Sequence, residues 1–478
     1  MPDFNGMKFG GGSLTRFVAL RPPTDWKTEI LSGVTTFLTM AYILFVNPAI
    51  LSAAGVPFQA AVTATALGAA LMSICMGVVT NRPLALASGM GINAVLAFTV
   101  IGFQQARMPW QVGMAAIFVE GLLTLVLVLT GFREAVMEAI PVNLKRAIGA
   151  GIGLFITLIG LNQGGLIRSA PITLVSLGDF SQKYVWVTLA GLFITVILMA
   201  YKKSSAILVG MVSATIFAMI LRLVVPSSAI ISIPQFTTFF APFQAAGPGG
   251  SMAIWQVFSP LVLTGVFGIM LTDFFDTMGT VVAIGERAGF ADHEGKVEGL
   301  REILVVDAAA ATVGGLFGAS SITTYVESAS GISVGGRTGW VAIIAGICFA
   351  LSALFSPLIQ LIGGGVFVPK AEIYKLFTAA GFQMTQGDAV VYPITAGALI
   401  TVGFMMMGVL RKIDWDDFSE AFPAFLILIG IPLTYNISYG IGLGMITHTV
   451  IRFARGQAVK PLMAVISIAF LVAFIVAR

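Results

Sequence analysis

The sequence predicts an all-α integral membrane protein whose chain crosses the bilayer fourteen times. Hydrophobic residues make up 57% of the 478 residues, charged residues make up 10%, and long apolar runs recur along the whole chain. Soluble domains carry about 25% charged residues, so most of this surface is suited to lipid rather than water. Runs of about 18 or more apolar residues with few charges are typical of membrane-spanning helices.

The apolar runs form two sets of seven predicted segments. The first set lies at 31–52, 59–80, 84–104, 111–130, 146–161, 184–201 and 205–225. The second set follows an uncharged stretch containing Pro and Gly at about 226–257, and lies at 258–284, 302–318, 322–336, 339–362, 391–410, 421–435 and 437–452. A further apolar run at 460–477 either crosses the bilayer or lies in its interface. Residues 1–28 hold no continuous apolar core of the kind a signal peptide needs, and are predicted to be a cytoplasmic N-terminal segment.

The basic residues orient these segments. With the N-terminus inside the cell, 19 of the 26 Lys and Arg residues fall on the cytoplasmic side, where membrane-protein loops carry excess positive charge. The same rule favours two short crossings that meet at Tyr435 and Asn436, because one long crossing would place Arg452, Arg455 and Lys460 outside. The net charge is only +4 and the basic residues lie at segment ends, which argues against nucleic-acid binding.

The third segment of each set differs from the others. The stretches "LALASGMGINAVLAFTV" (84–100) and "SITTYVESASGISVGG" (321–336) are short and carry Ser and Gly at their middle. Discontinuous segments at corresponding positions of two halves are typical of transporters built from repeats, which bind their substrate near the bilayer midplane. The sequence therefore predicts a seven-plus-seven inverted repeat with a polar site between these two discontinuous half-helix segments, 3 and 10.

Two aspartates lie in an apolar stretch of the eighth segment. "LTDFFDTMGT" (271–280) places Asp273 and Asp276 three residues apart, which puts both on one face of a helix. A charged side chain at the bilayer centre costs about 2.5 to 3.5 kcal/mol, so both must point into protein or water. The two aspartates therefore indicate a polar site, a proton relay or both. The alternative is a face that lies near a membrane surface.

Glu327 and Asn93 are candidate partners of this pair. Glu327 follows an extended stretch and opens a short helix, where the helix dipole favours an anion or a hydrogen-bonding ligand; the alternative is a capping glutamate. Asn93 holds the corresponding position in the first half, and its amide offers donors and acceptors suited to the edge of a heterocycle. On spacing alone, Asn93 could equally be an amide that packs helices together.

Other residue types exclude several functions. Cys75 and Cys348 lie in apolar segments, and the two isolated histidines, His293 and His448, make no metal site. The sequence shows no nucleophile and base pair of an enzyme and no repeated filter motif of a channel. We therefore expect neither a cofactor nor catalysis. In "GAGIGLF" (149–155), helix packing through small residues is favoured over a dinucleotide loop.

Five motifs spread over nearly the whole chain resemble those of the AzgA-like purine permeases. This family is a branch of the nucleobase-cation symporter-2 (xanthine/uracil permease) superfamily. The motifs are "TTFLTMAYILFVNPAIL", "ALASGMGINA", "TDFFDTMGT", "TTYVESASGISVGGRTG" and "FPAFLILIGIPLTYNISYGIGLG". Ala319 in "GASSITTY" departs from the threonine expected in this family, which bears on substrate detail rather than on class.

The resemblance implies an architecture and a division into domains. Core and gate domains are each assembled from both halves, often in a homodimer. The core would comprise residues 29–135 and 258–365, and the gate residues 136–257 and 366–478, which include the C-terminal hydrophobic segment. The resemblance also implies a plasma or inner membrane protein that imports purine nucleobases (hypoxanthine/guanine or adenine) by proton symport with alternating access.

The resemblance assigns roles to single residues. Asp276 would bind the purine, Asp273 would be a nearby essential acid, and Glu327 and Asn93 would complete the binding set. Thr280 stands where the more distant uracil permeases have a histidine implicated in the proton site, so proton coupling is expected at Asp273, Asp276 and Thr280. The predicted substrate-binding set also includes Ser88, Gly89, Phe275 and Tyr325, the two aromatic residues as stacking partners of the base.

An anion exchanger of the same seven-plus-seven architecture is the alternative function. An anion site would be expected to carry a positive residue, whereas this site gathers acids that repel an anion. The acidic site therefore favours a neutral, hydrogen-bonding substrate. Because burial favours the neutral form of a carboxyl group, one of the acids could also take up the coupling proton.

Overall fold

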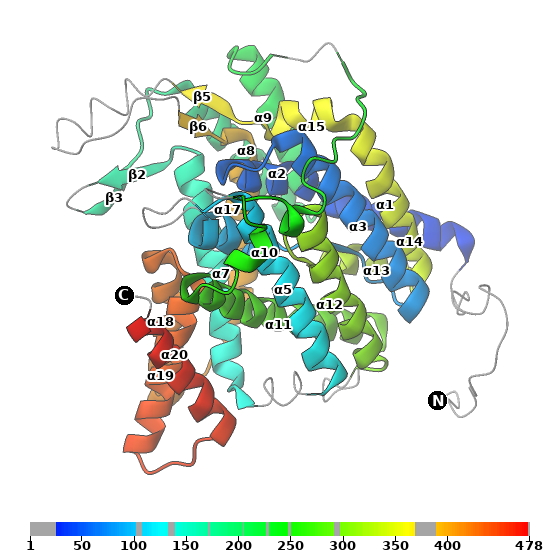
Figure 1. Ribbon diagram of the computed structural model, residues 1–478. Helices are drawn as coiled ribbons and strands as arrows, with labels where there is room; N and C mark the ends of the chain where they lie inside the picture. Colours follow the sequence, from blue (N-terminus) through cyan, green and yellow to red (C-terminus); the bar gives the residue numbers. More distant parts are fainter. Residues whose placement is uncertain are drawn as a thin grey trace.

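Helices occupy the predicted apolar runs of the first half (Figure 1). The computed structural model describes residues 25–101, 108–131, 139–170, 173–203, 205–225, 229–246, 250–290, 297–368 and 389–476. The helices of the first half are α1 (Trp26–Met40), α2 (Ile43–Ala53), α3 (Phe58–Thr80), α4 (Met90–Ala94), the π-helix η2 (Val95–Ile101), α5 (Trp110–Leu129), α7 (Val142–Gln163), α8 (Lys183–Ala200) and α9 (Ala206–Ile220). The first predicted segment is thus two helices that break at Ala41 and Tyr42.

The second half follows the same plan after two short helical pieces, η3 (Ala241–Phe243) and α10 (Ala253–Gln256). Its helices are α11 (Pro260–Ala288), α12 (Leu300–Phe317), α13 (Ser328–Val334), α14 (Gly339–Ser352), η4 (Ala353–Phe355), α15 (Ser356–Gly363), α17 (Pro393–Met406), η5 (Met407–Lys412), α18 (Phe418–Thr434), α19 (Ile437–Ala454) and α20 (Pro461–Val476). The turn at Tyr435 and Asn436 separates α18 from α19, as predicted.

The all-α prediction is incomplete, because the described residues also form three short antiparallel strand pairs. They are β1 (Leu86–Ser88) with β4 (Ile322–Thr324), β2 (Ile167–Ala170) with β3 (Leu174–Leu177), and β5 (Val366–Val368) with β6 (Ala389–Val391). The β1–β4 pair joins the two predicted discontinuous segments directly. Extended backbone inside a membrane protein needs partners for its N–H and C=O groups, and these two strands supply them to each other.

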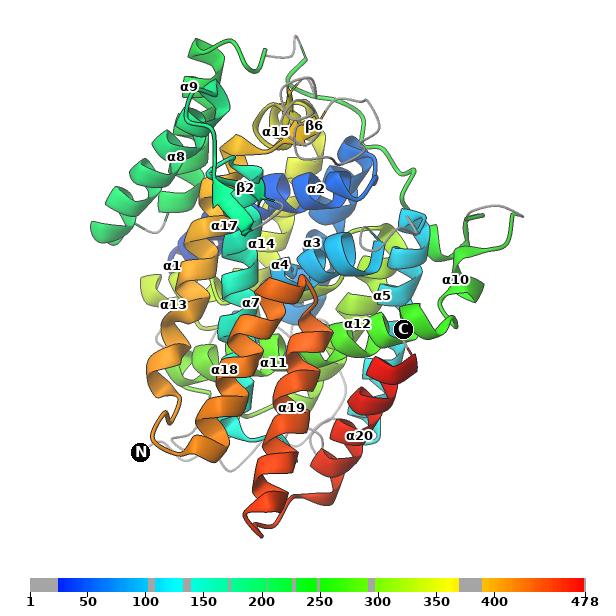
Figure 2. The same ribbon diagram turned by 90° about the vertical axis from the view of Figure 1, so that its left-hand side faces the viewer.

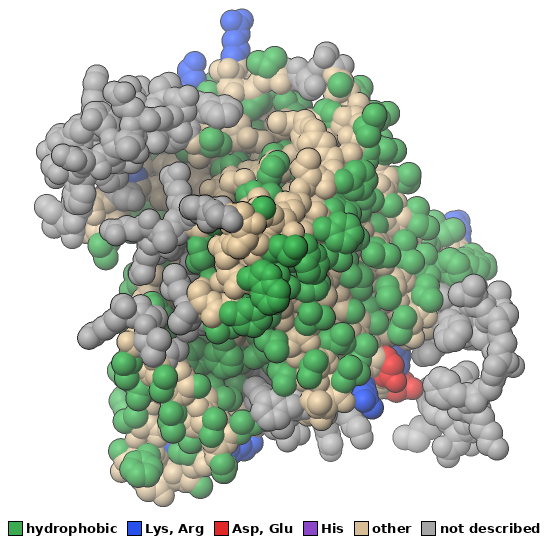
Figure 3. All heavy atoms as spheres, in the orientation of Figure 1, with side chains coloured by type: hydrophobic (Ala, Val, Ile, Leu, Met, Phe, Trp, Pro, Cys, Tyr) green, Lys and Arg blue, Asp and Glu red, His purple; other side chains and the backbone are tan. Residues whose placement is uncertain are grey.

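The outer surface of the helices is apolar. Within the described ranges, seven helical stretches are long and apolar enough to cross a bilayer: Trp26–Ala53, Phe58–Thr80, Trp110–Leu129, Val142–Gln163, Lys183–Ala200, Gly339–Gly363 and Pro393–Lys412. In Figure 3, hydrophobic side chains spread over the face in view, and the coloured charged groups lie toward its margins. Such a surface is that of an integral, multi-pass membrane protein.

Helices of the first half pack against helices of the second half (Figures 1 and 2). α3 of the first half packs on α14 of the second, and α5 of the first half packs on α12 of the second. Among the remaining helices, α7 packs on both α17 and α18, α8 packs on α9 and α17, and α18 packs on α19. The molecule therefore contains two helix groups, and each group takes members from both halves.

Glycines set close approaches inside the second helix group. A Cβ atom on Gly153 of α7 would lie 2.7 Å from the backbone oxygen of Gly403 of α17. A Cβ atom on Gly151 would lie 2.8 Å from Cδ1 of Ile431 in α18. The prediction that "GAGIGLF" packs helices is therefore confirmed. Cys75 and Cys348 are both free thiols.

Basic residues at the segment ends contact other loops predicted on the same side of the membrane. Arg82 forms an ion pair with Glu298 at 3.1 Å. Arg301 donates to the backbone oxygen of Leu129 at 3.3 Å, at the end of α5. These contacts join segment ends that the sequence predicts to lie on one side of the membrane.

Candidate functional site

The β1–β4 pair is the centre of the candidate site. Beyond the paired residues, Gly89 N–H donates to Ser321 O at 2.9 Å and Tyr325 N–H donates to Ala85 O at 3.0 Å. Gly89 allows a close approach, because a Cβ atom there would lie 2.9 Å from the Thr323 methyl carbon Cγ2. β1 leads into α4 and β4 is followed by α13, so both discontinuous segments change from strand to helix at this point.

One face of α11 lies against this centre. Asp273, Asp276, Thr277 and Thr280 recur at helical spacing, and α11 packs against β4, α13 and α4. Asp273 is fully buried, Thr280 is 8% exposed and Asp276 is half-buried. Of the two aspartates, Asp276 is therefore the less buried.

The side chain of Asn93 in α4 is fully buried. Neither the oxygen nor the nitrogen of its amide has a hydrogen-bond partner among the residues that the structure describes. Burying an amide without a partner costs free energy, so such a group indicates either a cost tolerated for another reason or a ligand site. For Asn93 the position beside α11 and β1 favours a ligand site.

Asp276 and Glu327 lie close enough for their charges to interact. Asp276 lies within electrostatic range of Glu327 and of Asp307 in α12. Oε1 of Glu327 accepts a hydrogen bond from the Tyr42 hydroxyl at 2.6 Å. Neither Oε2 of Glu327 nor the Asp276 carboxylate makes a hydrogen bond within the described ranges. The site thus presents two acceptor groups and one amide that are not committed to protein partners.

Asp307 is a buried acid of the site that the sequence analysis did not identify. Its carboxylate accepts from Thr277 at 2.6 Å, from Thr323 at 3.3 Å and from Thr324 N–H at 3.1 Å. Asp307 therefore fastens α12 to α11 and β4. Its place in the apolar stretch "ILVVDAAAATV" is the signal that could have found it, by the same burial argument that identified Asp273 and Asp276.

The other predicted binding residues are distributed around the strand pair. The Ser88 hydroxyl donates to Ala319 O at 2.7 Å, and the Tyr325 hydroxyl donates to Ser88 O at 2.5 Å. Both side chains therefore hold the strand pair in the present conformation. Ala319 also accepts from Asn47 Nδ2 at 3.1 Å through its backbone oxygen, which any residue type would supply. The side chain of Phe275 lies outside the described part of the structure.

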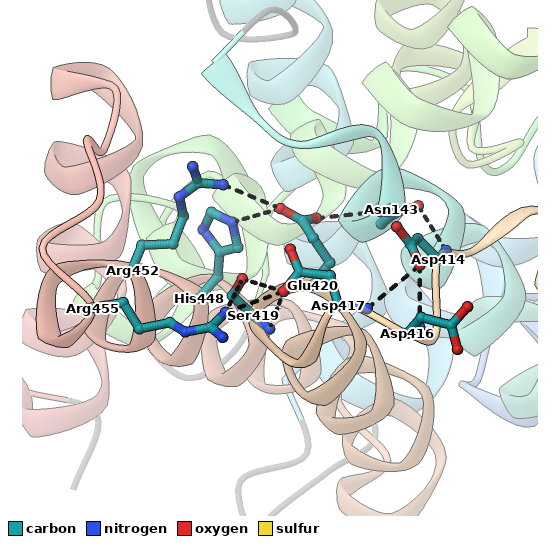
Figure 4. Close-up of polar contacts among 9 residues, drawn as sticks. All are labelled: Asn143, Asp414, Asp416, Asp417, Ser419, Glu420, His448, Arg452 and Arg455. Atoms are coloured by element: carbon teal, nitrogen blue, oxygen red, sulfur yellow. Dashed lines mark hydrogen bonds and ion pairs between the residues drawn. The ribbon is translucent and has the colours of Figure 1, made fainter.

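A second polar cluster lies in the other helix group and is drawn in Figure 4. Glu420 of α18 contacts His448 at 3.1 Å and Arg452 at 3.5 Å, both in α19. Hydrogen bonds from the side chain and backbone of Ser419, followed by Arg455, hold the pKa of Asp417 below its usual value of 3.8. These contacts fasten the ends of α18 and α19 together.

Solved structures share this fold. The transmembrane domain of the bicarbonate transporter BicA of a cyanobacterium superposes with a TM-score of 0.59 at 15% identity, covering 86% of this chain and 97% of that one. Murine Solute Carrier 26 family member A9, an anion transporter in the inward-facing state, superposes with a TM-score of 0.58 at 10% identity. The superposition covers 95% of this chain and 74% of that one. At these identities the likeness shows the fold alone.

Similar sequences cover more than nine tenths of the chain. The guanine/hypoxanthine permease PbuO of Bacillus subtilis is 37% identical over 454 residues, 94% of this chain and 97% of that relative. The adenine permease AdeP of Escherichia coli is 36% identical over 466 residues, which is 97% of this chain and 96% of that relative. The nucleobase transporter PlAzg2 of Paenibacillus larvae is 32% identical over 438 residues, which is 91% of this chain and 78% of that relative.

The model of a family described as "Permease family" matches residues 27–391, most of the chain and all of the candidate site. Together with relatives that align over 94% and 97% of this chain, this match confirms the resemblance found in the sequence. The chain therefore belongs to the nucleobase-cation symporter-2 (xanthine/uracil permease) family, among its AzgA-like purine permeases, and it is a transporter rather than an enzyme.

Proposed function

We propose that the protein is a secondary transporter that imports a purine nucleobase, of the hypoxanthine/guanine or the adenine type, together with a proton. One observation carries the proposal. Three polar groups near the β1–β4 pair make no hydrogen bond within the described chain. They are the amide of Asn93, the carboxylate of Asp276 and Oε2 of Glu327. The names of the relatives support the substrate class, since they include guanine/hypoxanthine and adenine permeases.

These groups suit a purine because its edges carry N–H donors and ring-nitrogen acceptors. A carboxylate accepts hydrogen bonds, whereas the Asn93 amide both donates and accepts. Asp276 and Glu327 would each hold an N–H edge of the base, and Asn93 would contact another edge. A flat, neutral base carries no charge for the acids to repel, so a site with two carboxylates favours it over an anion.

Proton coupling is assigned to the acids of α11. Burial favours the protonated form of a carboxyl group, so an acid that is reached from one side at a time can take up a proton outside and release it inside. We assign purine binding to Asp276, and proton carriage to Asp273 or Asp276 with Thr280 on the same face. The partial exposure of Asp276 supports its assignment to purine binding, and the complete burial of Asp273 is compatible with a role in proton carriage.

The proposed cycle moves a core domain against a gate domain. The core consists of residues 29–135 and 258–365 and carries the candidate site, and the gate consists of residues 136–257 and 366–478. The two helix groups and the contacts exchanged between halves support this division and a seven-plus-seven inverted repeat of fourteen crossings. We also propose that the N-terminus is cytoplasmic and that the protein forms a homodimer.

An anion exchanger is the alternative, since both solved neighbours named above are anion transporters. The described part of the site holds Asp273, Asp276, Asp307 and Glu327, and such a gathering of acids disfavours an anion. Uptake assays that compare hypoxanthine with sulfate and bicarbonate separate the two functions. Uptake of the anions in the absence of purine uptake would establish the exchanger.

Uptake into proteoliposomes tests the proposal. Labelled hypoxanthine uptake, driven by an acidic outside and competed with unlabelled adenine, guanine, xanthine and uracil, should be saturable and should identify the preferred purine. Asp276→Asn and Glu327→Gln should abolish uptake while the protein still folds. Wild-type transport in both variants would refute the site.

An acid outside the site provides the matched control. Asp179 is exposed and lies in the turn before α8. Asp179→Asn makes the same acid-to-amide change and should keep wild-type uptake. A loss of uptake in this variant would mean that the assay reports general damage rather than the site.

A further inference from the structure

Glu327 is held from the first helix pair of the chain. Tyr42 lies at the break between α1 and α2, is 1% exposed, and donates its hydroxyl proton to Glu327 Oε1 at 2.6 Å. The two residues are 285 positions apart in the sequence. The preceding turn contributes as well, because the Thr39 hydroxyl lies 3.5 Å from the backbone oxygen of Glu327. The break in the first segment therefore contacts both the carboxylate and the backbone of Glu327.

The hydrogen bond makes the two oxygens of Glu327 unequal. Hydrogen bonds to a carboxylate are short and strong because the acceptor is charged, and 2.6 Å is typical of them. Oε1 is committed to Tyr42, whereas Oε2 forms no hydrogen bond within the described chain. The phenol is a donor at physiological pH, so Oε1 serves it as an acceptor.

The other titratable groups around Glu327 do not duplicate this contact. Tyr325 donates to Ser88 O instead, and Asp276 lies within electrostatic range of Glu327 as a second acid. At the far end of α13, Arg337 N–H and the Thr338 hydroxyl donate to Glu29 of α1. Among the described residues, Tyr42 is thus the hydrogen-bond donor to the Glu327 side chain.

We propose that Tyr42 is a positioning residue for purine binding, which acts by donating to Oε1 of Glu327, a contact that favours the ionised carboxylate, and by turning Oε2 toward the base. This inference rests on the proposed function of the site. A carboxylate fixed in this way can only accept, so the purine must present an N–H group to it. Tyr42 thereby distinguishes the two acids: Glu327 has a hydroxyl donor that favours its role as an acceptor, whereas the Asp276 carboxylate has no hydrogen-bond donor within the described chain.

Tyr42→Phe tests the role because it keeps the ring in its packed position and removes only the donor. We expect the KM for hypoxanthine uptake to rise about tenfold, the size expected for losing one hydrogen bond to a charged group. Without the donor, Glu327 takes up a proton more readily. Purine binding should therefore fall off on the acid side at a higher pH than in the wild type, and this shift is a readout that a merely structural role would not move.

A double-variant comparison assigns the effect to Glu327. In the Glu327→Gln background, which has no carboxylate to hold, adding Tyr42→Phe should change purine affinity less than twofold, since the partner of the phenol is already gone. Binding is measured by ligand-induced thermal stabilisation, because Glu327→Gln is expected to lack uptake and retain only weak affinity. Equal losses from Tyr42→Phe in both backgrounds would overturn the proposal.

Two further variants keep the test decisive. Tyr392 is a second buried tyrosine, 5% exposed, beside Gly365 and outside the site. Tyr392→Phe should leave KM and pH dependence unchanged.

Glu327→Asp is the substitute test if Tyr42→Phe does not fold. It shortens the acid away from the phenol and should reproduce the pH shift; an unshifted profile overturns the proposal. Failure of the wild type to bind any purine would instead refute the proposed function.

Discussion

The hydroxyl of Thr277 donates to Asp307 Oδ2 at 2.6 Å, which fastens α11 to α12 at the place where β4 passes between them. Thr277 follows Asp276 directly in the sequence, so the backbone of the proposed purine-binding acid is held through its neighbour. Thr277 and Thr323 also lie 2.9 Å apart through their hydroxyls. Asp307 therefore helps to set the position of α11 and β4 in the candidate site.

Asp307→Asn should destabilise the protein and weaken purine binding. The asparagine keeps one acceptor oxygen for the Thr324 backbone N–H but is neutral, and its N–H₂ group then faces the Thr277 hydroxyl, which loses a charged acceptor. Losing a buried, charge-assisted hydrogen bond costs about 1 to 3 kcal/mol. Thermal unfolding with and without hypoxanthine measures both effects. Thr277→Val removes a single donor and should give a smaller change in the same direction; unchanged stability in both would contradict the role.

Asn93→Leu should raise the stability of the ligand-free protein and abolish stabilisation by purines. Leucine has a similar volume, and it removes two buried amide atoms that lack partners in the described structure. An unsatisfied buried polar group costs about 1 to 3 kcal/mol, so its removal is favourable. Melting temperatures with and without hypoxanthine are the measurement. A lowered melting temperature of the ligand-free variant would favour the packing role that the sequence left open.

Gly89→Ala should reduce uptake because the added methyl group collides with the β4 strand. The backbone of Gly89 has φ −70°, which alanine accepts, so the effect is steric: the Cβ would lie 2.9 Å from Thr323 Cγ2. Overpacking of this kind costs about 1 to 3 kcal/mol. Adding Thr323→Ser removes that methyl group, keeps the hydroxyl, and should restore uptake.

Gly149→Ala is the matched control for this change. Gly149 lies inside α7, and a Cβ there would meet no atom within 4 Å. Alanine should therefore be tolerated, and it should stabilise the helix by up to about 1 kcal/mol. Equal damage from Gly89→Ala and Gly149→Ala would mean that the collision with Thr323 is not the cause.

Asp417→Asn should lower stability by the same amount at pH 5 and at pH 8. Ser419 and Arg455 lower the pKa of Asp417 in the folded protein below its usual 3.8. A lowered folded-state pKa gives stability that is present above the usual pKa and is lost as the pH falls through the lowered one. Asparagine still caps α18, so only the charge is tested. The melting temperatures of the wild type and the variant should begin to converge below pH 3.8, as the pH falls toward the lowered pKa. A difference between the two proteins that changes between pH 5 and 8 would contradict this assignment.

The helices could be predicted from the sequence because the bilayer leaves the chain little choice. An apolar run in lipid must satisfy its own backbone hydrogen bonds, so its length and its charged ends mark a helix. The break at Tyr435 and Asn436, and the interruption of 84–100 and 321–336, followed from charge and composition in the same way. The three strand pairs did not, since three or four extended residues carry no distinctive pattern.

The candidate site was predictable only in part. Asp273, Asp276, Glu327 and Asn93 are polar groups in apolar surroundings, and the cost of burying them is visible in the sequence itself. Asp307 had the same signal and was missed. Tyr42 had none, because a tyrosine at the middle of an apolar run is an ordinary packing residue until its hydroxyl finds a partner.

The sequence by itself determined the class of protein, the order of its helices, the family, and the acids that must avoid lipid. Only the tertiary structure decided the partners: β1 with β4, Thr277 with Asp307, and Tyr42 with Glu327. The physical reason is range. Burial cost and helix formation are local properties of each segment, whereas a hydrogen bond between residues 285 positions apart depends on the packing of the whole chain.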